Sequence, residues 1–184
     1  MAEDIWSQEY WALKDDLKLF MWRKRVGDPT RDTVPKPVLF LVHGSSFSGP
    51  TGFDLQVPGK LNYSLMDKFA SYGFDVWTLD HEGYGRSDST DGNSPISEGI
   101  HDLKAGMDVV MRETGQTAAA FYGSSSGALR AAAFAEAYPE HTNKLILDAF
   151  VYTGDGAPTL IERAKKMDQW TASNVRSVDR AFFL

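Results

Sequence analysis

Short apolar runs recur along the chain, and each is followed by glycine, serine or charged residues. These runs are too continuous for an amphipathic helix, and their length suits strands that are buried on both faces of a sheet. The runs are residues 38–42, 75–79, 118–122 and 144–149. The pattern therefore predicts a sheet whose centre is covered on both sides.

Segments with helical periodicity fill the intervals between these runs. Residues 64–72 place apolar side chains three and four positions apart, with Ser64 as the expected N-cap. A longer amphipathic helix is expected over residues 95–113, and another over 126–138. Because strands alternate with helices, we expect right-handed crossovers and a mostly parallel sheet with helices on both faces.

The first part of the chain has a different pattern. Residues 8–26 predict two strands joined by a turn at Asp15-Asp16, with aromatic and aliphatic residues on both arms. The basic cluster Arg23-Lys24-Arg25 is expected at the exposed end of the second strand. Residues 27–37 contain three prolines and no periodicity, which is typical of a connecting loop.

Composition narrows the class of protein. The chain has 184 residues, 42% of them hydrophobic and 24% charged, which is ordinary for one soluble globular domain. A net charge of −6 without a Lys/Arg run argues against a nucleic-acid partner. The acidic N-terminus lacks the apolar core of a signal peptide, and no apolar run is long enough for a membrane span. A cytoplasmic location is the default expectation.

The residue types also bound the chemistry. Cysteine is absent, so disulfides and thiolate metal sites are excluded. No cluster of His, Asp and Glu has metal-ligand spacing, and no glycine pattern after a strand matches a phosphate-binding loop. We therefore expect neither a metal nor another cofactor.

The strongest chemical signal is the pattern Gly123-x-Ser125-x-Gly127. It lies between an apolar run and a helix, so Ser125 is expected on a sharp strand-to-helix turn. Glycines on either side suit a tight turn, and the N-terminal N–H groups of the following helix favour negative charge there. His43, Asp80 and Asp148 also follow predicted strands, and the carboxyl ends of such strands are where chemistry is found.

Three motifs, in order and at the ends of strands, resemble those of the alpha/beta hydrolase superfamily. The resemblance covers about residues 8–150. His43-Gly44-Ser45-Ser46 resembles the HG loop of that superfamily. Asp80-x-x-Gly83-x-Gly85-x-Ser87 resembles the turn after its fourth strand, and Gly123-x-Ser125-x-Gly127 resembles its nucleophile elbow.

This resemblance implies an α/β architecture, the alpha/beta-hydrolase fold, truncated after about the sixth strand at the start of a cap. Residues 1–149 would be the N-terminal part of the core, and residues 150–184 the beginning of a helical cap or lid. Within the latter, periodicity predicts a short helix over 159–167 and the start of another over 171–184.

The resemblance also implies roles for individual residues. Ser125 would be the nucleophile, and the backbone N–H groups of Ser126 and Ser45 would form the oxyanion hole. Asp148 is a candidate triad acid, because some members place the acid after the sixth strand; the alternative is a carboxylate that caps the next turn. The remaining motif residues would be structural, namely His43, Gly44, Asp80, Gly83, Gly85, Gly123 and Gly127.

One part of the family pattern is missing. The triad order is Ser, then acid, then a His after the last strand, yet only His141 follows Ser125, and it precedes a strand. We therefore expect a C-terminal part outside these residues to supply the histidine and the acid, either as a second polypeptide from a cleaved chain or as a continuation of the same chain. Without a base, a serine hydroxyl is a poor nucleophile, so the chain alone is expected to be nearly inactive.

The resulting expectation is a serine hydrolase that cleaves small, hydrophobic carboxylic esters through an acyl-enzyme. Thioesterases, C–C bond hydrolases, lactonases and acyltransferases share these motifs, and fold does not separate them. The alternative from another class is a non-catalytic, ligand-binding member or inactive fragment of the same fold.

Overall fold

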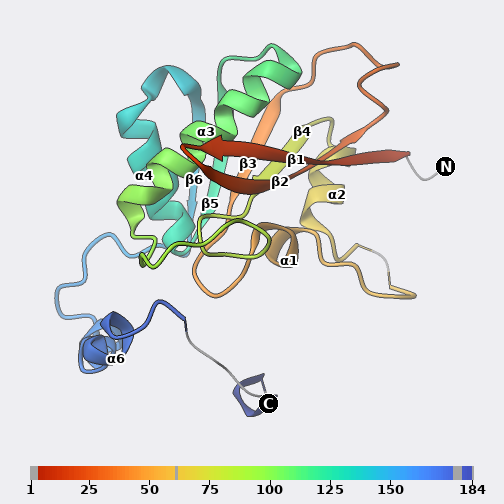
Figure 1. The fold of residues 1–184 in the computed structure, drawn as a ribbon. Helices are drawn as coiled ribbons and strands as arrows, with labels where there is room; N and C mark the ends of the chain where they lie inside the picture. Colours follow the sequence, from red (N-terminus) through yellow and green to blue (C-terminus); the bar gives the residue numbers. More distant parts are fainter. Residues whose placement is uncertain (1–3, 61, 176–179, 184) are drawn as a thin grey trace. The chain divides into compact units, whose positions relative to one another are not determined.

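The computed structural model describes residues 4–60, 62–175 and 180–183. Its six strands form one mixed sheet in the order β1-β2-β4-β3-β5-β6 (Figure 1). The first three strands in this order pair antiparallel, and the pairs β4–β3, β3–β5 and β5–β6 are parallel. The strands are β1 Ile5–Lys14, β2 Leu17–Val26, β3 Val38–Val42, β4 Asp75–Leu79, β5 Ala119–Ser124 and β6 Thr142–Asp148.

Helices cover both faces of this sheet, as the alternation of strands and helices predicts. One face packs against α3 (Ile96–Thr114) and α4 (Ser126–Ala137), and the other packs against α1 (Gly49–Phe53) and α2 (Leu65–Ser71). A short 3-10 helix, Pro139–His141, precedes β6. The helix α1 lies between β3 and α2 along the chain.

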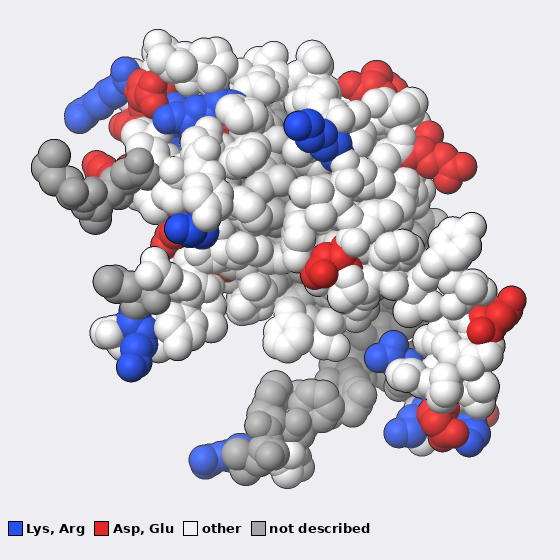
Figure 2. Space-filling model, turned by 180° about the vertical axis from the view of Figure 1, so that it is seen from behind, with Lys and Arg blue, Asp and Glu red and all other residues white. Residues whose placement is uncertain are grey.

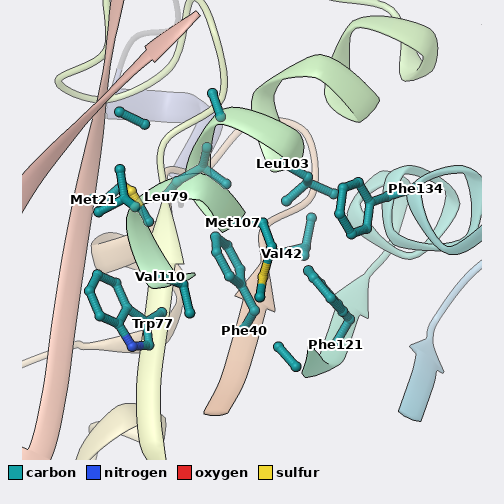
Figure 3. Packing of buried hydrophobic residues seen from close by; sticks show 14 of the residues in the cluster. Met21, Phe40, Val42, Trp77, Leu79, Leu103, Met107, Val110, Phe121 and Phe134 are labelled. Atoms are coloured by element: carbon teal, nitrogen blue, oxygen red, sulfur yellow. The ribbon is translucent and has the colours of Figure 1, made fainter. Parts of the chain in front are cut away.

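Strand β3 shows why continuous apolar runs indicate a doubly covered sheet. Because side chains alternate along a strand, Val38, Phe40 and Val42 join the core under α3 and α4, whereas Leu39 and Leu41 join the core under α1 and α2. In the first core, the rings of Phe40 and Phe121 stack with centroids 5.4 Å apart (Figure 3). The sheet thus needs apolar residues at every position of its central strand.

The predicted N-cap of α2 is confirmed. The hydroxyl of Ser64 accepts a hydrogen bond from the backbone N–H of Asp67 across 2.9 Å. This bond satisfies one of the amide groups that the first helical turn leaves without a partner. Gly73, at φ 92°, follows the helix in a conformation that residues with side chains rarely adopt.

The prediction that Arg23, Lys24 and Arg25 lie at an exposed strand end is wrong. All three are buried in β2, because carboxylates from outside the strand pair with them. Arg23 donates two hydrogen bonds to Asp75, at 2.8 and 2.5 Å. Lys24 pairs with Asp54 and Asp67, and Arg25 pairs with Asp32. This basic cluster therefore becomes a set of internal ion pairs.

Residues 1–90 and 94–150 form one compact unit, and residues 91–93 and 151–184 form a second. The second unit contains α5 (Pro158–Ala164), α6 (Met167–Thr171) and a 3-10 helix, Arg180–Phe183. The prediction of a helix that starts at Thr171 is wrong, since α6 ends there; residues 176–179 and 184 of that prediction lie outside the described residues.

The surface carries charges of both signs. On the face shown in Figure 2, Lys and Arg occur singly or in small groups near Asp and Glu, with uncharged surface between them. This face therefore presents no large field of a single sign. Among the described residues, no helix combines the length and the apolar composition that crossing a lipid bilayer requires.

Candidate active site

Ser125 occupies a sharp turn between β5 and α4. Its backbone has φ 57° and ψ −123°, a region that residues with side chains rarely occupy, and its side chain is exposed. Glycines make the turn sterically feasible. A β-carbon on Gly123 would lie 2.5 Å from the carbonyl oxygen of Gly127, and one on Gly127 would overlap that of Val42. These contacts are with backbone atoms, which cannot swing aside.

The HG loop, residues 43–46, lies directly against this turn. A β-carbon on Gly44 would lie 2.8 Å from the carbonyl oxygen of Ser124 and 3.0 Å from the β-carbon of Ser125. The backbone N–H of Ser45 donates to the hydroxyl of Ser126 across 2.8 Å, and the two hydroxyl oxygens are 2.9 Å apart. The structure therefore brings together the residues that the sequence pairs as nucleophile and oxyanion donors.

The two predicted oxyanion donors differ in their present partners. Ser126 is the first residue of α4, so its N–H has no acceptor within the helix. The Ser45 N–H is bonded to the Ser126 hydroxyl, which an incoming oxyanion would have to replace. Negative charge beside the N–H groups of Ser45 and Ser126 would also be stabilised by the positive, N-terminal end of the α4 dipole.

His43 is a buried, neutral brace of the HG loop. Its Nε2 accepts the backbone N–H of His81 across 3.0 Å, so its proton lies on Nδ1, 2.8 Å from the carbonyl oxygen of Gly44. Burial, assisted by repulsion from His81, lowers the pKa of His43 to about 3. Both ring nitrogens are therefore occupied, Nδ1 by the HG loop and Nε2 by the turn after β4.

The turn after β4 holds its conformation through Asp80. The Asp80 carboxylate accepts the backbone N–H groups of Gly49 and Arg86 at 2.8 and 2.9 Å. Burial raises the pKa of this carboxyl. Gly85 has φ 53°, and a β-carbon there would overlap the Asp80 carboxylate. Gly83 has φ 78°, so both glycines of the motif occupy positive-φ positions.

Asp148 ends β6 beside the elbow. Its backbone carbonyl accepts the N–H of Ser125 across 2.9 Å, and its carboxylate accepts the hydroxyl of Tyr122 across 2.8 Å. The Ser124 hydroxyl is 3.3 Å from the same carboxylate oxygen. Burial and the Asp148 carboxylate raise the pKa of Tyr122 to about 12. The Asp148 carboxylate thus stabilises neighbouring hydroxyl groups from its place next to Ser125.

The histidines lie in three different settings. His43 and His81 are buried; His81 Nδ1 is 2.9 Å from Asp102. His101 is exposed on α3, and Nδ1 of His141 bonds the Thr117 carbonyl across 2.8 Å. In the described part of the chain, none of these rings hydrogen-bonds Ser125. No group of three His, Asp or Glu side chains there is arranged to hold a metal ion.

Sequence reasoning missed Asp102, which lies fully buried in α3 and contacts both His81 and Lys14. A signal for it exists. Gly99 and Gly106 stand three positions before and four positions after Asp102, so all three share the helix face that packs on the core. An acidic residue between glycines on one helix face therefore indicates a buried carboxylate that pairs with polar groups of other elements.

Comparisons with known proteins identify the family of this chain. The family model described as serine aminopeptidase, S33, matches residues 59–178. A 2-hydroxy-6-oxononadienedioate/2-hydroxy-6-oxononatrienedioate hydrolase of Paraburkholderia phymatum is 34% identical over 129 residues, which is 67% of this chain and 38% of the relative. The chain therefore spans well under half the length of this curated relative.

Solved structures show the same fold. A 2-hydroxy-6-oxo-6-phenylhexa-2,4-dienoate hydrolase from Rhodococcus superposes with a TM-score of 0.65 and 18% identity, over 92% of this chain and 54% of its own. An esterase of Pyrococcus furiosus superposes with a TM-score of 0.61 and 18% identity, over 89% of this chain and 63% of its own. On this evidence the chain belongs to the serine aminopeptidase S33 family of alpha/beta hydrolases.

Proposed function

We propose that this chain carries the nucleophile and the oxyanion hole of a serine hydrolase that cleaves small, hydrophobic carboxylic esters. The observation that carries the proposal is the backbone of Ser125, at φ 57° and ψ −123°, between β5 and α4. Backbone strain of this kind persists only where the surrounding structure enforces it, and strained residues cluster at active sites. In our proposal the strained turn holds the Ser125 hydroxyl clear of the sheet.

The chemistry is acyl transfer in two steps. The Ser125 oxygen attacks the ester carbonyl while a histidine takes its proton, and the resulting oxyanion accepts N–H bonds from Ser126 and Ser45. The intermediate collapses to an acyl-enzyme, and the alcohol leaves with the proton from the histidine. Water then attacks the acyl group by the same route and regenerates the serine.

The base comes from outside this chain in our proposal. His43 and His81 are buried and bonded elsewhere, and His101 and His141 lie on a helix surface and before β6. The position of strand β6 favours the presence of a further part of the protein. This strand lies at the edge of the described sheet, and its residues Leu145 and Ile146 are 37% and 50% exposed. We propose that a C-terminal part, on a second polypeptide, supplies the histidine and the acid.

Asp148 is the alternative source of the acid. Its place after β6, one hydrogen bond from the elbow, supports that role. Its carboxylate already accepts a hydrogen bond from the Tyr122 hydroxyl, which favours a structural role. We also propose that residues 150–184 begin a helical cap, the part of this fold that selects the substrate.

One other reaction has specific support. The curated relative at 34% identity is named as a hydrolase of 2-hydroxy-6-oxononadienedioate, so a hydrolase of C–C bonds in such keto acids is our second candidate. Its substrate would also place a carbonyl carbon next to Ser125. Thioester and lactone hydrolysis, and acyl transfer, use the same elbow.

Labelling with a fluorophosphonate tests the proposal, because the probe requires an activated serine. We expect the complete protein to be labelled at Ser125, the Ser125→Ala variant not to be labelled, and the matched Ser124→Ala variant to retain labelling. An intact-mass spectrum of the native protein would show whether a second polypeptide co-purifies. A complete protein that the probe leaves unlabelled would favour the non-catalytic, ligand-binding alternative.

A further inference from the structure

Beside the turn after β4 lies a buried ion cluster that the proposed reaction does not use. The Lys14 ammonium is 2.5 Å from the Glu82 carboxylate and 2.7 Å from Asp102 Oδ1. The Asp102 side chain is completely buried, and those of Lys14 and Glu82 are 9% exposed. Because buried charges are stable only when paired, these three groups depend on one another.

Asp102 also holds the first two residues of that turn. Its Oδ2 is 2.9 Å from Nδ1 of His81 and accepts the backbone N–H of Glu82 across 3.2 Å. A carboxylate can only accept, so the proton of the His81 ring lies on Nδ1. Burial lowers the pKa of His81 to about 4, which keeps this ring neutral at neutral pH. Asp102 thereby anchors both the ring of His81 and the chain that follows it.

The backbone of His81 passes this constraint to the HG loop. Its N–H donates to Nε2 of His43 across 3.0 Å, which leaves the His43 proton on Nδ1, facing the Gly44 carbonyl oxygen at 2.8 Å. That carbonyl and the Ser45 N–H belong to one trans peptide, so they point in opposite directions. Holding the carbonyl toward His43 therefore turns the Ser45 N–H away from it, toward α4, where it meets Ser126.

We infer that Asp102, held by Lys14, is a positioning residue that sets the direction of the Ser45 N–H through His81 and His43. The inference deepens the proposed function and rests on it, because it matters only where that N–H stabilises an oxyanion. A misdirected donor would weaken binding of the developing negative charge and leave binding of the neutral substrate unchanged.

Nitrogen-15 NMR of the imidazole rings in the complete wild-type protein tests the structural half of the inference without any activity. We expect neutral rings at pH 7 for both His43 and His81, each with its proton on Nδ1. A His43 ring with its proton on Nε2 would overturn the inference, because it could neither accept the His81 N–H nor hold the Gly44 carbonyl. This measurement remains decisive if variants of Asp102 do not fold.

Fluorophosphonate kinetics of the Asp102→Asn variant test the functional half. In the variant, the amide oxygen would turn to Lys14 and the amide NH₂ to His81, which forces the His81 proton onto Nε2. Because removing one oxyanion donor lowers rates by about 100- to 1,000-fold, a misdirected donor should lower kinact by about 10- to 100-fold. KI should change less than about twofold, since the neutral probe binds before charge develops.

Asp108→Asn is the matched control, because Asp108 lies on the same helix, is exposed and pairs with Lys104. It should react like the wild type. If Asp102→Asn lowers only the melting temperature and leaves kinact unchanged, the inference is wrong and the cluster is purely structural. If the wild type itself is not labelled, the proposed function fails, while the NMR result still decides whether the two rings have the tautomers that the inference requires.

Discussion

Gly127 approaches the carbonyl oxygen of Val42 so closely that a β-carbon between them would overlap that oxygen. Val42 is the last residue of β3, and Gly127 is the second residue of α4. The turn at Ser125 and the HG loop can meet only because α4 has no side chain at its second residue, Gly127. The relationship links the two strands whose ends build the site.

Gly127→Ala should therefore destabilise the protein strongly. The new methyl group meets backbone atoms of Val42 and His43, which can move only if β3 and α4 separate. We expect the free energy of unfolding to fall by about 3 kcal/mol, at the upper end of overpacking effects, in urea denaturation. Gly52→Ala in α1 is the control, because nothing lies within 4 Å of its β-carbon, and it should not destabilise.

The strain at Ser125 makes a second prediction. Replacing Ser125 with glycine removes the steric penalty of φ 57° but increases the freedom of the unfolded chain. With about 1–3 kcal/mol of strain against about 1 kcal/mol of entropy, Ser125→Gly should be more stable than Ser125→Ala by about 1 kcal/mol. A Ser125→Gly variant that is less stable than Ser125→Ala would mean that the turn is relaxed, because only the entropic cost of glycine would then remain.

Much of this arrangement could be predicted from sequence, because the signals are local. The apolar runs that become β3, β4 and β5 need no partner information, and the Ser64 cap and the Gly123–Gly127 spacing each act within one turn. The buried basic residues of β2 could not be predicted. Arg23 is buried because Asp75, far along the chain, meets it in the folded sheet, and no local pattern records that meeting.

The Arg23–Asp75 pair should contribute far more than the surface pair between Arg86 and Glu9. Asp75→Asn leaves a buried guanidinium without its carboxylate, so we expect a loss of about 3–5 kcal/mol in the free energy of unfolding. Glu9→Gln removes an exposed pair and should cause no measurable loss. A double variant, Arg23→Met with Asp75→Leu, should recover much of the stability, because it leaves no buried charge unpaired.

The two buried histidines predict how stability depends on pH. Their folded pKa values, about 3 for His43 and about 4 for His81, lie below the usual 6.5, so the unfolded chain binds more protons between pH 4 and 6.5. Stability is therefore full above pH 6.5 and declines as the pH falls through this window, by up to about 1.4 kcal/mol per pH unit for each histidine.

Urea unfolding at pH 7, 6 and 5 checks this dependence. His81→Gln should lower absolute stability yet reduce the slope by about one proton. His101→Gln serves as the control, because His101 is exposed on α3, and it should leave the slope unchanged. A wild-type protein whose stability does not vary between pH 7 and 5 would contradict the burial of His43 and His81.

The site itself was predictable only in part. The HG loop and the elbow are recognisable because each motif is contiguous in sequence, and the structure brings Ser45, Ser125 and Ser126 together. Asp102 was missed because its role depends on His81 and Lys14, which lie far from it along the chain. Contacts of this kind arise from the packing of α3 against the hairpin β1–β2, which sequence periodicity does not specify.

Asp148→Asn separates the two roles that we consider for Asp148. The carboxylate accepts the Tyr122 hydroxyl across 2.8 Å and, after burial, is the main reason why the pKa of Tyr122 is raised to about 12 from 10.0. Removing the charge should lower that pKa toward 10, measured as tyrosinate absorbance against pH, with Tyr122→Phe to identify the signal. If the carboxylate only stabilises Tyr122, the complete protein should still be labelled by fluorophosphonate at the wild-type rate. A fall of about 10,000-fold, as expected when a triad acid is lost, would instead make Asp148 the acid that orients the histidine.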